Sequence, residues 1–368
     1  MIWIDKQEPL DRAVERLSGE SVIAVDTEAD SLHSYFDKVC LVQISANGDD
    51  LVVDPLSGID LSGFGEILAD PAVTKVLHGA DYDLRIMNRD FSFTIASLID
   101  TSVCAQILGY EAFGLAALLE RHFGVKLNKV HQRADWAMRP LSPDMLQYAS
   151  LDTHYLIALA DKLREELGEL GRWEWAVEEF SRLEAIRFHE NDDLERWRKM
   201  KNLGKLDRRS LAIVRALVDW RDTLARAADR PPFKIMGSEP IIEIARARPD
   251  NTADLAKVKG MSRYHLDRYG RDLLRIVGEA MQIPEAELPE KGDARPWTRD
   301  RELDSSVERM KKIRDRVARE LKIDPAVLAP RHILTSIATT GDLDQVPAMR
   351  AWQKRVVGAE LLAVLKKA

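Results

Sequence analysis

The chain has 368 residues, of which 45% are hydrophobic and 31% are charged, and its formal net charge is −7. This length suits two or three domains whose cores need no disulfide or metal for stability. The two cysteines have no zinc-motif spacing, no apolar stretch approaches the roughly 18 residues of a membrane span, and the first residues lack a secretory-signal pattern. We therefore expect a soluble, cytoplasmic globular protein that does not associate with membranes.

Charge is distributed unevenly along the chain. Residues 1–200 carry 20 Lys and Arg against 36 Asp and Glu, whereas residues 201–368 carry 34 against 25. Such asymmetry is typical of an acidic working domain followed by a basic region that holds a polyanion. On composition alone, the alternative is that the difference in charge between the two halves arose by chance.

Strand-like runs dominate the first hundred residues. Residues 21–26, 40–45 and 50–55 are largely apolar runs with β-branched residues, and the close spacing of the three predicts an antiparallel meander. A fourth run, residues 75–79, follows a helical pattern at residues 63–71. We therefore expect the fourth strand to lie parallel to the first.

Helical periodicity takes over after Asp81. Residues 96–108 and 115–123 predict two helices, and residues 142–170 predict one long helix that opens with Ser-Pro. Together with the strands, these helices predict an α/β domain in which one mixed sheet is flanked by helices.

The rest of the chain is predicted to be helical. Residues 171–209 become increasingly basic and are expected to lead out of the first domain as helices. Residues 283–300 contain three prolines and many charges, which indicates a linker between two all-helical segments. We expect these two helical segments at residues 210–282 and 301–367, after the first domain.

Acidic residues stand at the ends of several predicted elements. Asp26 and Glu28 end a buried strand, where residues two apart point to the same side, so both carboxylates can face one site. Asp83 stands at a helix start, and on spacing alone Asp81 competes with it. Taken alone, acids at such positions more often end a strand in solvent or cap a helix than form a functional site.

A tyrosine and a further acid share one face of the predicted helix at residues 142–170. Tyr148 and Asp152 are four residues apart, which places a phenol beside a carboxylate. A strand end, a helix start and a helix face can thus bring four carboxylates to one oxygen-rich site. Hard oxygen ligands suit Mg²⁺ or Mn²⁺, and two such ions support phosphodiester hydrolysis.

Three motifs carry a family resemblance. In chain order, VDTEAD, HGADYDL and YASLDTHYL resemble the three exonuclease motifs of the DEDD superfamily. Tyr148, four residues before Asp152, matches the DEDDy branch, whereas the DEDDh branch would need a histidine at the position of Gln147. The segments TEADSLHSYFDKVCLVQIS and DWAMRPLSPDMLQYASLDTHYL, which contain or flank these motifs, are similar to bacterial ribonuclease D over about residues 1–200.

The resemblance implies both a fold and a division of roles. The fold would be an RNase H-like α/β exonuclease domain followed by two all-α HRDC (helicase and RNase D C-terminal) domains, at residues 210–290 and 296–368. Asp26 would bridge two divalent metal ions, Glu28 and Asp152 would complete one metal site, and Asp83 rather than Asp81 would hold the second ion. Tyr148 would orient the attacking water.

The resemblance also implies an activity. The protein would be a 3′–5′ exoribonuclease that releases nucleoside 5′-monophosphates from structured RNA, with tRNA precursors as substrates, and it is expected to be a monomer. Two alternatives stay open from the residues themselves. One is a DNA 3′–5′ exonuclease, since metals contact phosphate rather than sugar, and the other is a non-catalytic RNA-binding scaffold.

A basic and aromatic segment in the second half is the candidate for RNA contact. The predicted loop at residues 258–265 and its flanks combine glycine with cations and aromatic rings, which suits phosphates and unpaired bases. The candidate nucleic-acid-binding residues are Lys257, Lys259, Arg263, Tyr264 and Arg268.

Overall fold

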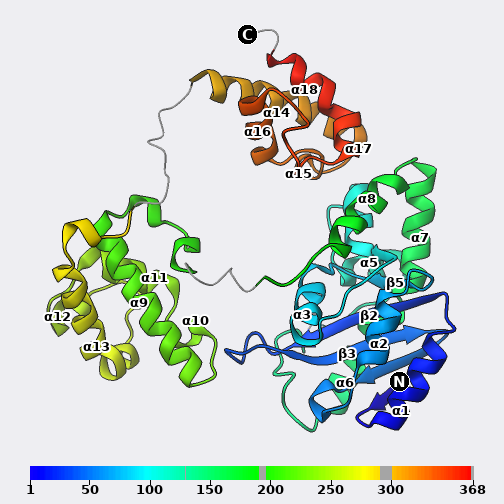
Figure 1. The fold of residues 1–368 in the computed structure, drawn as a ribbon, viewed down its shortest axis with the longest axis horizontal. Coiled ribbons are helices and arrows are strands. Elements are labelled where there is room, and N and C mark those ends of the chain that lie inside the picture. Colours follow the sequence, from blue (N-terminus) through cyan, green and yellow to red (C-terminus); the bar gives the residue numbers. More distant parts are fainter. Residues whose placement is uncertain (129, 190–195, 291–300, 366–368) are drawn as a thin grey trace. The chain divides into compact units, whose positions relative to one another are not determined.

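The computed structural model describes residues 1–128, 130–189, 196–290 and 301–365 (Figure 1). Its internal contacts define two compact units. The first unit comprises Met1–Asp30, Lys38–Phe188 and Arg299–Ala368, and the second comprises Ser31–Asp37 and His189–Thr298. Among the described residues, no helix combines the length and apolar character needed to cross a bilayer.

A six-stranded mixed sheet forms the centre of the first unit, in the order β1-β4-β3-β2-β5-β6 (Figure 1). Strands β2, β3 and β4 form the predicted antiparallel meander, and β5 pairs in parallel with β2, as predicted. The strands are β1 (Ile2–Ile4), β2 (Val22–Ala29), β3 (Val39–Ala46), β4 (Asp49–Val53), β5 (Thr74–Leu77) and β6 (Leu98–Asp100).

Helices pack around this sheet and bury its apolar residues. All eight residues of β3 are buried, because neighbouring strands cover its edges and other elements cover its faces. The helices of residues 1–188 are α1 (Gln7–Leu17), α2 (Ser62–Ala69), α3 (Asp81–Phe91), α4 (Thr101–Leu108), α5 (Leu115–Phe123), α6 (Pro143–His154), α7 (Leu156–Glu169) and α8 (Trp173–Glu184), with a 3₁₀ turn at Pro55–Ser57.

Two of the predicted helices differ from the structure. The helix expected at 96–108 begins only at Thr101, because Asp100 ends β6 and its side chain caps α4 by accepting from the backbone N–H groups of Ser102 and Val103. The single helix expected at 142–170 is two helices, α6 and α7, which meet at Tyr155. Its predicted start is correct, since the Ser142 hydroxyl accepts from the N–H of Met145.

The C-terminal segment of the first unit is helical and has its own apolar core. Its helices are α14 (Arg301–Leu321), α15 (Pro325–Leu328), α16 (Arg331–Thr340), α17 (Ala351–Gln353), a π-helical turn at Lys354–Gly358 and α18 (Ala359–Ala363). Trp352 stacks on Trp175 of α8 at a ring-centroid distance of 4.7 Å, and Arg350 forms an ion pair with Glu179 at 2.8 Å. These contacts join the segment to the sheet-containing part of its unit.

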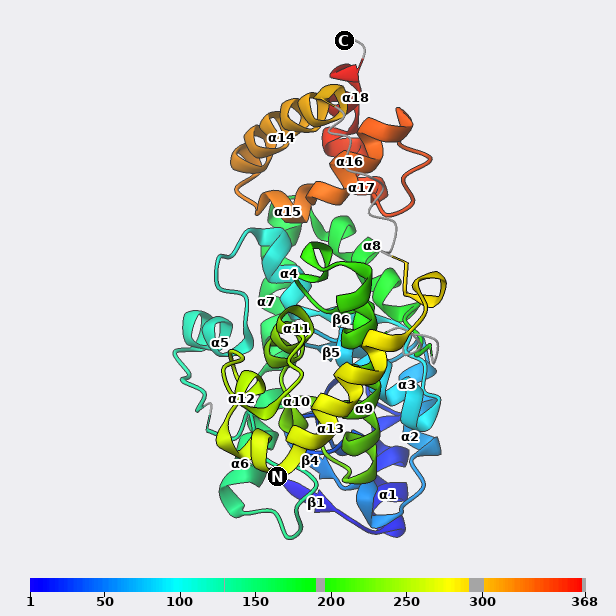
Figure 2. The same ribbon diagram turned by 90° about the vertical axis from the view of Figure 1, so that its left-hand side faces the viewer.

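The second unit is built around α9 and α13, which lie side by side (Figure 2). Its helices are α9 (Arg208–Ala227), α10 (Pro232–Ile235), α11 (Ser238–Ala247), α12 (Thr252–Leu255) and α13 (Arg263–Gln282), with 3₁₀ turns at Arg196–Lys199, Leu203–Lys205 and Glu285–Glu287. The predicted loop at 258–265 ends earlier than expected, because the Ser262 hydroxyl caps α13 and places Arg263 and Tyr264 in its first turn. Most of the predicted linker, residues 291–300, lies outside the described residues.

Candidate active site

Three of the predicted carboxylates meet where β2 ends. Asp26 and Glu28 lie two residues apart on β2, and Asp152 comes from α6, which packs on β2, β3 and β4. One ligand oxygen from each of Asp26, Glu28 and Asp152 lies within 4.8 Å of the other two. This spacing lets one ion contact all three carboxylates. We call Asp26, Glu28, Asp83 and Asp152 the acidic cluster.

Asp83 is the fourth member of the cluster. It lies in the first turn of α3, is 8% exposed, and accepts a hydrogen bond from the Thr27 hydroxyl of β2. Thr27 stands between Asp26 and Glu28, so this bond places Asp83 next to them, and the charge of Asp83 helps to raise the pKa of Asp26 after the larger effect of burial. Asp81 instead is exposed and forms a two-pronged ion pair with Arg85 at 2.8 and 3.0 Å. The geometry therefore favours Asp83 over Asp81.

Repulsion and burial together disfavour the charged forms of the cluster. Burial, followed by the charges of Asp152 and Asp83, raises the pKa of Glu28 to about 9. Burial raises the pKa of Asp152 to about 7 and that of Asp83 to about 6. Within the described ranges no lysine or arginine forms an ion pair with the cluster. The oxygen-only donor set and its uncompensated charge fit hard divalent cations.

Tyr148 lies one helical turn before Asp152 on α6. Burial, followed by the charges of Asp152, Glu28 and Asp26, raises the pKa of its phenol. The hydroxyl therefore stays protonated near neutral pH and can both donate and accept hydrogen bonds. The ring of Tyr148 lies 5.9 Å, between centroids, from the rings of both Trp136 and His131. Tyr148 thus lies beside the acids with its ring held by aromatic neighbours.

The segment before α6 is tied to the sheet by Arg139. Its guanidinium donates to both carboxylate oxygens of Asp54 at 2.7 and 2.6 Å, and to the backbone carbonyls of Trp136 and Cys40 at 2.7 and 2.9 Å. Asp54 follows β4 directly, and Cys40 lies on β3. Arg139 therefore helps to fix where α6 begins, and with it the placement of Tyr148 and Asp152.

Two supporting residues were not identified from the sequence. Thr27 stands inside the first motif, but a threonine between two acids gives no sign of which residue it will bond. Asp54 lies in a turn, where aspartate is common for local reasons. His78 and His154, also near the motifs, bond Thr101 at 2.8 Å and Asp50 at 2.9 Å.

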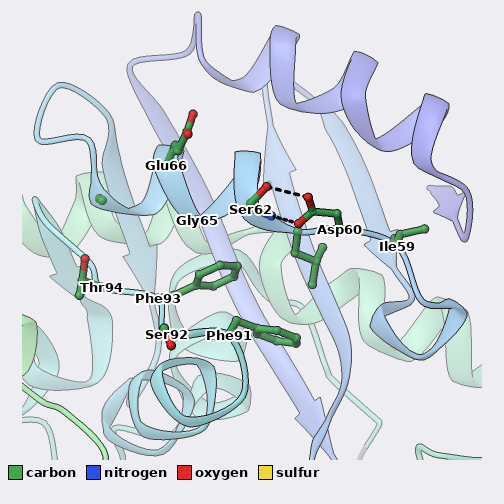
Figure 3. A pocket seen from close by; sticks show the side chains of 11 residues that line it. Ile59, Asp60, Ser62, Gly65, Glu66, Phe91, Ser92, Phe93 and Thr94 are labelled. Carbon is green, nitrogen blue, oxygen red and sulfur yellow. Dashed lines mark hydrogen bonds between the residues drawn. The ribbon is translucent and has the colours of Figure 1, made fainter.

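A separate surface pocket of about 560 Å³ shares no residue with the acidic cluster (Figure 3). It is lined by α2, the residues before it, and residues 91–94. The Asp60 carboxylate accepts hydrogen bonds from the N–H and hydroxyl of Ser62, at 2.9 and 3.0 Å, and so helps to start α2. These acidic and hydroxyl groups are therefore already satisfied by a local structural role.

The candidate RNA-binding residues lie near the start of α13, most of them beside a partner. Lys257 and Lys259 form ion pairs with Asp254 and Glu239, both at 2.7 Å. Arg263 lies 3.6 Å from Asp267, and Arg268 donates to the Tyr269 hydroxyl at 3.2 Å. The side chain of Tyr264 is 55% exposed. Nucleic-acid contact by these residues stays a prediction.

Comparison with known proteins agrees with this arrangement. Residues 1–168 match the family model for a 3′–5′ exonuclease, and residues 210–277 match the model for the HRDC domain. A ribonuclease D from Gluconacetobacter diazotrophicus is 31% identical over 368 residues, which span 99% of this chain and 92% of the relative. The chain belongs to the ribonuclease D family. The predicted family is therefore confirmed.

Other members of the ribonuclease D family support the same assignment. A ribonuclease D from Pseudomonas paraeruginosa is 28% identical, with 100% of this chain and 98% of the relative covered. The crystal structure of Escherichia coli RNase D, described as an exoribonuclease involved in structured RNA processing, has a TM-score of 0.77 and 27% identity, covering 99% of this chain and 98% of that one. These findings confirm the predicted fold class and a hydrolytic 3′–5′ exoribonuclease.

Proposed function

We propose that this ribonuclease D removes nucleoside 5′-monophosphates from the 3′ end of structured RNA, with tRNA precursors as substrates, and that it uses two divalent ions, Mg²⁺ or Mn²⁺. The observation that carries the proposal is the approach of Asp26, Glu28 and Asp152 within 4.8 Å, beside Asp83. Carboxylates held this close without a cation repel one another, and divalent ions relieve that repulsion.

The residues of the site have distinct proposed roles. Asp26 would bind both ions, Glu28 and Asp152 would complete one site, and Asp83 would hold the second. The ions, when bound, supply electrostatic stabilisation of the attacking and leaving oxygens of an in-line displacement. The Tyr148 hydroxyl would orient the attacking water, because it stays protonated and lies one turn from Asp152. Positioning of the terminal nucleotide then lowers the barrier further.

The basic half would hold the RNA. An acidic catalytic domain repels a polyanion, so net positive charge elsewhere in the chain must compensate. We propose three domains, at residues 1–200, 210–290 and 296–368, and the latter two would be HRDC domains. The first residues of the third domain lie outside the described ranges. The monomeric state and the cytoplasmic location stay predictions.

A direct assay tests the reaction. Incubated with Mg²⁺ or Mn²⁺, the protein is expected to shorten a 3′-extended tRNA one nucleotide at a time, releasing 5′-monophosphates that chromatography identifies. A DNA oligonucleotide of matched sequence serves as the comparison substrate, and Asp26→Asn controls for contaminating nucleases. Faster digestion of DNA would instead support a DNA exonuclease, and no digestion of either would support a non-catalytic scaffold.

RNA contact near the start of α13 is tested by a paired substitution. The double variant Arg263→Ala/Tyr264→Ala is expected to weaken RNA binding, and to reduce the slope of log K against log salt by roughly 0.7, because one phosphate contact and one stacking ring are lost. Fluorescence anisotropy at several salt concentrations measures both quantities. Arg275→Ala is the matched control, since Arg275 lies farther along α13 and pairs with Glu279 at 2.9 Å. Equal effects of both variants would remove this surface from the RNA path.

A further inference from the structure

Gln43 is a fully buried polar residue whose amide has no hydrogen-bond partner. Its side chain is 0% exposed, and neither Oε1 nor Nε2 bonds any of the described residues. Nearly all buried polar groups in proteins are paired, because an unpaired one has lost its water without compensation. The neighbouring polar residue of β3, Ser45, follows this rule, since its hydroxyl bonds Asp50 and Thr153 at 2.6 and 2.7 Å.

The position of Gln43 does not call for a polar residue on packing grounds. β3 has the sequence VCLVQISA and is buried throughout, so an apolar side chain of similar volume would fit there with no unpaired atoms. Val52, the residue directly opposite Gln43 on β4, offers no polar side chain. Burial of this unpaired amide therefore lowers the stability of the fold, and packing does not explain why a polar residue stands here.

The register of the sheet places Gln43 directly opposite Asp26. In the antiparallel pair of β2 and β3, Asp26 pairs with Gln43. Residues directly opposite each other point to the same face, with their Cβ atoms about 4.5–5.5 Å apart. The side chain opposite Gln43 on β2 is thus a member of the acidic cluster, and it lies within reach of a glutamine amide.

We propose that Gln43 is a positioning residue for Asp26, which holds this carboxylate in the orientation that binds divalent ions. The inference rests on the proposed function. An amide suits the task because Nε2 donates to a carboxylate oxygen without neutralising its charge. A lysine or arginine here would compete with the ions for Asp26. Removal of a group that hydrogen-bonds a metal ligand commonly lowers metal affinity or activity by roughly 10- to 100-fold.

The test replaces the amide with an apolar chain of similar length. Gln43→Met is expected to weaken Mn²⁺ binding by roughly tenfold, measured by titration calorimetry on the full chain. In the absence of metal its Tm should equal or exceed that of the wild type, since no unpaired polar atoms are left. The rise in Tm on adding Mn²⁺ should shrink. The hydrolysis rate should fall at limiting Mn²⁺ and recover at high Mn²⁺.

Three further variants separate the possible outcomes. Ile44→Met, on the opposite face of β3 and buried, controls for repacking and should bind Mn²⁺ like the wild type, since Ile44 pairs with Val25 rather than with an acid. Gln43→Leu repeats the test with a different side chain if the Met variant fails to fold. Asp26→Asn, run alongside, should lose Mn²⁺ binding; if it does not, the proposed metal site itself is wrong.

The result that overturns the inference is specific. If Asp26→Asn loses Mn²⁺ binding while both Gln43 variants keep wild-type affinity, the metal site stands and Gln43 has no part in it. A lower metal-free Tm combined with an unchanged rise in Tm on adding Mn²⁺ would show that Gln43 serves packing alone, and would equally reject the positioning role.

Discussion

Asp83→Asn is expected to reduce kcat for RNA hydrolysis by roughly 10³-fold or more, while Asp81→Asn leaves it unchanged. The two residues lie two positions apart in the first turn of α3, so the variants are matched in charge and in helix position. Asp83 is buried beside Asp26, whereas Asp81 is exposed and paired with Arg85. Loss of a metal ligand removes several kcal/mol of transition-state stabilisation, and each 1.36 kcal/mol corresponds to about tenfold in rate.

Single-turnover rates at saturating Mn²⁺ measure this effect without interference from product release. Asn keeps an oxygen that can accept from the Thr27 hydroxyl, so the bond between β2 and α3 need not be lost. Circular dichroism checks that both variants are folded. Equal rates for Asp83→Asn and the wild type, or a comparable loss in Asp81→Asn, would contradict the assignment of Asp83 to the metal site.

The central part of the fold could be predicted because its signals are strong and local. The meander at β2, β3 and β4 follows from apolar runs with short turns between them, and the parallel β5 from the intervening helix α2. The two missed strands, β1 and β6, are three residues long and lie at the edges of the sheet. Runs this short carry no periodicity, and their pairing depends on tertiary context.

The candidate site likewise contains residues that the sequence predicts and residues that it does not. Its acids stand in motifs whose spacing is visible in one sequence, whereas their partners come from distant positions. Arg139 and Asp54 are 85 residues apart, and Thr27 and Asp83 are 56 apart. A pattern in one segment cannot reveal a bond across that distance. The same limit applies to Lys259, a turn residue whose partner Glu239 lies in α11.

The break between α6 and α7 has no sequence signal either. Neither proline nor glycine occurs at residues 153–157, and the helical periodicity continues across Tyr155. The backbone changes there to φ −99° and ψ −3°, which starts a second helix. Because Asp152 lies in the last turn of α6, this break sets where the first helix ends relative to the acidic cluster.

The pH dependence of stability should report the mutual repulsion of the cluster. Without metal, Asp152→Asn is expected to be increasingly more stable than the wild type as pH rises from about 6 to 8. Burial raises the pKa of Asp152 to about 7 and that of Asp83 to about 6, above their ordinary values near 3.8. In this range the folded wild type therefore binds more protons than the unfolded chain, so its stability falls as pH rises.

Comparison with the variant isolates this effect from other titrating groups. Burial lowers the pKa of His78 and His122, which makes stability rise with pH in part of the same range, and it lowers the pKa of Lys75 to about 8. These groups are present in both proteins, so the difference in Tm removes most of their contribution. Asparagine does not titrate and does not repel Glu28. The stability of the variant should therefore depend less on pH than that of the wild type.

Thermal melts with and without Mn²⁺ measure the expected change. The difference in Tm between variant and wild type should grow by roughly 3–6 °C between about pH 6 and pH 8 in metal-free buffer. Added Mn²⁺ should stabilise the wild type more at the higher pH, since protons must leave the carboxylates before the ion binds. The variant should gain little from Mn²⁺ at either pH. A Tm difference that stays constant with pH would mean that Asp152 is already charged throughout this range, and that the four carboxylates do not share one enclosed site.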